Sequence, residues 1–240
     1  VMTVLFGCSG GNTQDQQAEF DKFTNELFCE SVMDDSISLN YTLQNPENYG
    51  ITDFVPTLGS YTLENMRAEI VQSENDLNRL KSFRYKNLSE EQKLTYDILK
   101  FVLELDVSFG DLLLYKENLS PTIGIQAQLP VLLAEYNFYS KEDIDHYIVL
   151  LTKTYDYFKE ILEFEREKAE AGLFMKDDTV DAIIAQCGEF IKDKEENLLI
   201  MVFDDRMDEE KGLSEEEKSR YKGQNKKAVV DYVIPAYELL

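Results

Sequence analysis

Apolar side chains recur at helical spacing along most of this chain. The longest pattern lies between Ser140 and Gly172, where it forms a stripe wider than one face, made of Ile144, Tyr147, Ile148, Leu150, Leu151, Tyr155, Tyr157, Phe158, Ile161, Leu162 and Phe164. This stripe predicts a helix of about thirty residues, roughly 45 Å long. Ser140 with Asp143 forms a capping-box pattern at its start, and Gly172 suits a left-handed end. The interleaved charges from Glu163 to Glu170 indicate a wetter C-terminal part.

The same periodicity predicts further helices at residues 16–33, 63–83, 90–109, 130–136, 179–192, 198–203 and from 215 onward. Ser89 with Gln92, and Ser214 with Glu217, are further capping-box patterns. The helix from residue 90 has a pattern that continues across Gly110 to residue 115. Its expected core-facing residues are Leu94, Ile98, Phe101, Val102, Leu105 and Phe109.

Single residues predict three further helix boundaries. Pro130 suits a first helical position, where its missing N–H leaves no helical bond unmade. Asp177 or Asp178 is expected to cap the helix at 179–192. Pro235 is expected to kink or end the last helix.

Residues 37–60 interrupt the helical pattern. Leu39, Tyr41 and Leu43 alternate briefly, and a turn-rich cluster follows at residues 45–50. We expect an ordered, irregular connection with a short strand-like piece. The predicted fold class is therefore all-α, with long antiparallel helices in an irregular multi-helix array and one ordered irregular loop region near 37–60.

Composition adds limits on function. The 240 residues carry a formal net charge of -23, which disfavours binding to nucleic acid and electrostatic docking to anionic membranes. Basic peptides or metal cations would be attracted, although a solvated surface explains such a charge as well. No composition shift or repeat divides the chain. We expect one helical domain at 16–240, preceded by a leader remnant and linker at 1–15.

Cys8 is a candidate lipidation site. Leu5 three residues before it, Gly7 just before it and a Gly- and Ser-containing linker after it resemble the end of a bacterial lipoprotein signal. The charged start and most of the apolar region of such a signal are not in this sequence. The pattern predicts a protein exported and tethered to the outer face of the bacterial cell membrane only through the lipid on Cys8. A short apolar N-terminal stretch is the simpler alternative.

The residues themselves indicate no catalytic centre. His146 is the single His, beside Asp143 and Asp145, and is interpreted as a surface side chain near a helix start. Neither a His-Glu-x-x-His pattern nor a pair of closely spaced Cys is present to hold zinc. Gln126, Gln128 and Glu135 near Pro130 could present polar groups to a ligand. They could equally close a loop between two helices.

Short pieces spread through the chain carry a family resemblance. They are the segments at residues 44–51 (QNPENYGI), 94–99 (LTYDIL), 124–130 (GIQAQLP), 134–136 (AEY), 171–175 (AGLFM) and 235–237 (PAY). In this order they resemble the bacterial domain-of-unknown-function family 885 (DUF885), many of whose members are exported lipoproteins. The family pattern has a His in many relatives where this chain has Asn40.

The family in turn resembles the gluzincin-like zinc metallopeptidases. Its members run to more than twice this length and carry a His-Glu motif and a further His in the C-terminal half. Neither is present here, so the resemblance assigns no catalytic residue and no metal ligand to these 240 residues, and zinc is expected in the C-terminal half of the same chain. The segment is expected to be the non-catalytic N-terminal helical portion. It would form one wall of a cleft for a peptide substrate, with Gln126, Gln128, Glu135 and Tyr136 as candidate lining residues.

The interpretation as an N-terminal portion predicts an exposed face onto which the C-terminal half docks. The alternative is a self-sufficient helical lipoprotein that binds a ligand or protein partner without catalysis. The reading frame beyond Leu240 distinguishes the two, since a His-Glu motif supports the first and a stop codon the second. An enzyme acting through His146 and its carboxylate neighbours is the most distant possibility.

Overall fold

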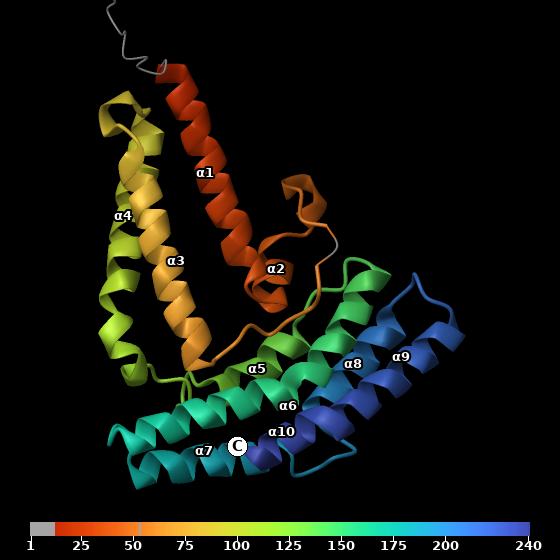
Figure 1. Ribbon diagram of the computed structural model, residues 1–240. Coiled ribbons are helices and arrows are strands. Elements are labelled where there is room, and N and C mark those ends of the chain that lie inside the picture. The colour runs from red at the N-terminus through yellow and green to blue at the C-terminus, as the bar shows by residue number, and fades with distance from the viewer. Residues whose placement is uncertain (1–12, 53) are drawn as a thin grey trace, which may run out of the picture. The chain divides into compact units, whose positions relative to one another are not determined.

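The computed structural model describes residues 13–52 and 54–240 (Figure 1). Cys8 and most of the predicted leader lie outside the described residues, so the lipidation site stays a prediction. All the regular structure in the described part is helical, which confirms the all-α fold class. None of these described helices is both long and apolar enough to cross a membrane. The chain divides into two compact units, one holding the described residues up to Glu30 with Arg67–Asp111, and the other Ser31–Met66 with Leu112–Leu240.

The first unit is a layer of three helices. It contains most of α1 (Thr13–Met33) and of α3 (Leu63–Ser82), the short 3-10 helix η2 (Tyr85–Asn87) and all of α4 (Glu90–Ser108). Its core consists of Phe20, Phe23, Leu77, Leu80, Leu88 and Leu103. At its edge, Arg79 binds Glu26 at 2.6 Å and lies over the ring of Phe23. Helix α1 starts at Thr13, so it includes the last residues of the leader remnant and linker predicted at 1–15.

The α4 helix shows the largest difference from expectation. Leu94, Ile98, Phe101, Val102, Leu105 and Phe109, predicted to face the core, are all exposed. Leu103 is buried instead, and Tyr96, Leu99 and Val107 pack beside it. Because α4 is apolar on two faces, its periodicity alone could not tell which face α1 and α3 cover. We call the six exposed residues the α4 stripe.

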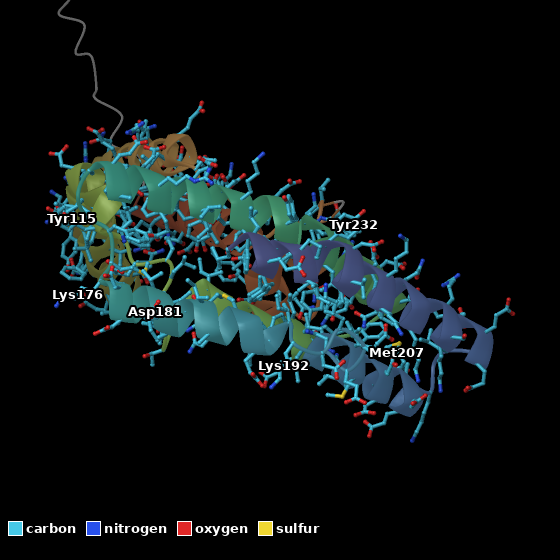
Figure 2. All side chains as sticks on the ribbon, turned by 90° about the horizontal axis from the view of Figure 1, so that it is seen from below. Tyr115, Lys176, Asp181, Lys192, Met207 and Tyr232 are labelled. Atoms are coloured by element: carbon cyan, nitrogen blue, oxygen red, sulfur yellow. The ribbon has the colours of Figure 1, made fainter. Side chains whose placement is uncertain are left out.

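The second unit is built around the long helix α6 (Lys141–Glu170). It also contains α2 (Ser36–Thr42), η1 (Pro46–Tyr49), most of η3 (Gly110–Tyr115), α5 (Ile125–Ala134), α7 (Asp177–Phe190), α8 (Leu198–Glu209), α9 (Glu215–Ala228), a π-helical turn η4 (Val229–Val233) and α10 (Ile234–Leu239). Figure 2 shows α7 passing Asp181 and ending near Lys192, with α10 next to it. Tyr147, Leu150, Leu151, Phe158 and Ile161 of α6 form the centre of the core.

Several predicted boundaries are confirmed and others are wrong. The capping boxes at Ser89, Ser140 and Ser214 are all formed. The strand-like piece is wrong, because Asp35 accepts from Ser38 N at 2.7 Å and starts helix α2 there. The α-helical part of the helix from residue 90 ends at Ser108, and residues 110–115 form a 3-10 helix.

The predictions for single boundary residues also need correction. Lys176, without a side-chain cap, precedes α7, so neither Asp177 nor Asp178 is its cap. Pro130 lies inside α5 rather than at its first position. Pro235 does not end the last helix, since the π-helical turn before it leads directly into α10.

Candidate functional site

A cavity of about 410 Å³ in the second unit is the candidate site. One wall comes from α2, η1 and the segment that follows them, and the other from the loop between α5 and α6 and the first turns of α6. Gly50, in the left-handed conformation at φ 77°, ends η1 and lets Ile51 N bind Pro46 O at 3.2 Å. The lining residues used below are Leu39, Leu43, Glu47, Ile51, Phe54, Tyr136, Tyr139, Glu142, Asp143 and His146.

The capping box of α6 fixes the carboxylate side of this cavity. Asp143 Oδ2 accepts from Ser140 N at 2.7 Å and from Ser140 Oγ at 2.9 Å. Glu142, on the same turn, is exposed. The helix therefore presents to the cavity one carboxylate held by the capping box and one exposed carboxylate.

His146 lies one turn further along α6. Its side chain is only 15% exposed, so the predicted surface position is wrong. The ring lies 4.8 Å from that of Phe54, and Nε2 is 3.7 Å from Glu142 Oε1. Nδ1 is buried and has no hydrogen-bond partner among the described residues. The covering residue Phe54 comes from the irregular segment, which helical periodicity could not place.

Two contacts fix the back of the cavity. Asn40 Nδ2 donates to Asn137 O at 3.0 Å, and Asn137 N donates back to Asn40 Oδ1 at 2.8 Å. Arg206 of α8 donates to the backbone oxygens of Ala134 and Tyr136. Burial, with a smaller effect from the nearby charge of Asp143, raises the pKa of Tyr136. The pair formed by Asn40 shows why an amide suits this buried position.

The predicted cleft residues lie in different surroundings. Tyr136 is buried and borders the cavity. Gln126 is buried within α5 and donates to Ser120 O at 2.6 Å and Gln186 Oε1 at 3.0 Å. Gln128 and Glu135 are exposed and do not line this cavity. The structure brings only Tyr136 to the cavity, and the cleft role of the four stays a prediction.

Helix α6 carries a cluster of buried charged side chains that its sequence pattern did not predict. Glu165 and Lys168 are both almost fully buried, although the charged pattern indicated a wet surface. Lys168 Nζ donates to Lys116 O at 3.0 Å and Glu117 Oε1 at 3.2 Å, and lies 3.8 Å from Glu165 Oε2. Neither Glu165 oxygen has a hydrogen-bond partner among described residues, and burial raises the pKa of this carboxyl group. Glu165 also borders an apolar hollow of about 190 Å³.

The described residues do not fit a zinc site. No group of three or more His, Cys, Asp or Glu side chains in residues 13–52 and 54–240 converges on a point that could hold a metal ion. A catalytic zinc needs about three protein ligands. His146, with Glu142 at its side, does not supply that set.

Comparison with known proteins places the chain. The model of the family described as "Bacterial protein of unknown function (DUF885)" matches residues 47–240. No curated protein matches. A solved structure described as "the putative lipoprotein from Colwellia psychrerythraea" is similar, with a TM-score of 0.70 and 16% sequence identity, over 95% of this chain and 40% of that chain. At this identity the similarity shows the fold. The chain thus spans about two fifths of the length of that solved protein.

Proposed function

Because this chain belongs to the bacterial family of unknown function DUF885, we propose that it is the non-catalytic N-terminal helical portion of an exported, lipid-anchored zinc metallopeptidase. In this proposal it forms one wall of a peptide-binding cleft, and Cys8 carries the lipid. The family match over residues 47–240 supports it. The fold shared with two fifths of a longer protein, itself described as a lipoprotein, supports it further.

The observation that carries the proposal is the α4 stripe. Phe101 is 68% exposed and Leu94 63%, and the other four side chains are each more than two fifths exposed. Large contiguous apolar surfaces on soluble proteins usually mark interaction sites. An apolar stripe at helical spacing suits packing against another helix. The remainder of a longer chain is the partner that the comparison favours.

The cavity between η1 and α6 supplies the cleft wall in this proposal. It is open to solvent, combines aromatic and carboxylate groups, and is large enough for a few residues of a peptide. The residues here bind and orient the peptide. Zinc and a general base on the remainder would activate the attacking water.

The test is reassembly from two parts of the gene product. Residues 13–240 and the remainder, expressed separately, are expected to associate in sedimentation velocity, and Ile98→Asn with Phe101→Asn is expected to abolish the association. A control pair at exposed positions of two other helices, Val149→Asn on α6 with Ile184→Asn on α7, should leave it intact. A gene that ends directly after the codon for Leu240, or association unaffected by the α4 substitutions, would instead favour a self-sufficient binding lipoprotein.

A further inference from the structure

The cavity between η1 and α6 is negatively charged. Glu47, Glu142 and Asp143 line it, and no Lys or Arg is among its described lining residues. Two basic side chains beside lining residues are engaged elsewhere. Lys141 binds Glu217 of α9 at 2.7 Å, and Arg206 donates to backbone oxygens behind the cavity. Among the described lining residues no Lys or Arg neutralises this negative charge, so a bound cation would be favoured.

Aromatic rings form much of the remaining wall. Phe54, Tyr136 and Tyr139 line the cavity together with the aliphatic side chains of Leu39, Leu43 and Ile51. Aromatic faces attract organic cations, and aliphatic walls pack against the apolar stem that carries such a cation. The His146 ring, packed on Phe54, completes the same wall.

The arrangement suits an organic cation better than a metal ion. The carboxylates lie on two separate elements, and no group of three possible ligands converges among the described residues. Asp143 already accepts two hydrogen bonds from Ser140. Glu47 and Glu142 are exposed. Their negative charges at the rim of the cavity can therefore attract a cation without both carboxylates losing their water.

We propose that this cavity binds the cationic end of a peptide, an ammonium or guanidinium group on an apolar stem. The inference rests on the proposed function, because it specifies the peptide class that the cleft wall receives. The strongly acidic chain, at a net charge of -23, would draw such a peptide toward the site.

The first test compares three probes of one shape with residues 13–240 in isothermal titration calorimetry. Benzylamine is expected to bind more tightly than benzyl alcohol, and benzoate is expected not to bind. Glu47→Gln with Glu142→Gln should weaken benzylamine about three- to tenfold and change benzyl alcohol less than about twofold. Glu189→Gln with Glu215→Gln removes the same charge from α7 and α9, away from the cavity lining, and should leave both affinities unchanged. Equal binding of the three probes, or an equal loss in the two double variants, overturns the proposal.

A second arm distinguishes the sources of the cation. A trialanine amide with a free amino terminus tests the α-ammonium group, and an acetylated peptide with a central lysine tests the side chain. Binding of either supports the proposal and names the source, whereas binding of neither overturns it. This experiment needs neither zinc nor the remainder of the protein. Its failure would leave docking on the α4 stripe standing, and failure of that docking would leave cation binding intact.

Discussion

The hydroxyl of Tyr237 donates a hydrogen bond to the backbone oxygen of Gln126 at 2.8 Å. That oxygen lies four residues before Pro130, which has no N–H to complete the helical bond. The side chain from α10 thus supplies the donor that the proline inside α5 lacks. Tyr237 is almost fully buried against Phe158 and Phe190, so the bond lies away from water.

Removing this hydroxyl should leave a buried carbonyl unpaired. Tyr237→Phe is expected to lower the free energy of unfolding by about 1–3 kcal/mol, measured by urea unfolding followed by circular dichroism. In a Pro130→Ala background the same change should cost less, because residue 130 then provides its own N–H to Gln126. An equal loss in both backgrounds would show that Tyr237 does not replace the proline's missing donor.

The bridge from Arg206 to the loop after α5 gives a second prediction. Its two terminal nitrogens lie 2.9 Å from Ala134 O and 2.6 Å from Tyr136 O, and its guanidinium stacks on Phe138. Arg206→Met should cost about 2–4 kcal/mol of unfolding free energy, since two charge-assisted bonds are lost. Arg206→Lys keeps the charge but cannot reach both oxygens with a planar fork, and should recover less than half of that. A lysine variant as stable as the wild type would contradict the bridge.

The raised pKa of Glu165 predicts how stability depends on pH. Burial makes the folded protein hold this proton more tightly than the unfolded chain does. The ionised carboxylate therefore destabilises the folded protein. In acid, where the group is protonated, this loss of stability is absent. It grows as pH rises from the ordinary carboxyl range through the raised pKa. Relative to wild type, Glu165→Gln should gain stability as pH rises through that window. Glu163→Gln, at an exposed site on the same helix, is the control, and a parallel trend in both variants would contradict the prediction.

Glu217 shows the opposite behaviour. The hydrogen bond from Lys141, with further bonds from Ser214, lowers its pKa to about 2. The ionised Glu217 therefore stabilises the folded protein. This stabilisation is fully present above the ordinary carboxyl pKa and is lost as pH falls toward about 2. Carbon-detected NMR titration should show Glu217 ionised well below the ordinary carboxyl range, and Lys141→Met should move its pKa back toward the ordinary value. A Glu217 pKa unchanged in that variant would contradict the Lys141 contact as the main cause.

The two faces of α4 should respond differently to substitution. Leu103→Ala removes a buried side chain and should cost about 2–4 kcal/mol in unfolding free energy. Phe101→Ala removes an exposed ring and should change it by less than about 0.5 kcal/mol. Equal costs at the two positions would mean that the stripe is covered within residues 13–240.

Helices could be predicted from the sequence wherever residues close together in the chain determine them. The capping boxes at Ser89, Ser140 and Ser214 depend on residues three positions apart, and all three form as predicted. The face that each helix buries depends on distant partners. The stripe of α4 and the buried charges of α6 were therefore misplaced, because a periodic pattern shows a face without showing what covers it.

The candidate site was only partly predictable for the same reason. Tyr136 could be named because it belongs to the segment 134–136 that resembles the family, and it borders the cavity. His146 was expected on the surface, because the residue that covers it, Phe54, comes from an irregular segment ninety-two positions away in the chain. The hydrogen-bonded pair of Asn40 and Asn137 likewise depends on the fold, and no sequence pattern around either residue predicts it.

Zinc content and peptide hydrolysis, measured side by side on the full gene product and on residues 13–240, decide whether this chain is the non-catalytic part of a zinc peptidase. We expect about one zinc ion per full-length chain, with cleavage of cationic peptides, and neither zinc nor cleavage with residues 13–240 alone. Stoichiometric zinc or peptide cleavage with residues 13–240, or a full gene product that binds no zinc, would contradict it.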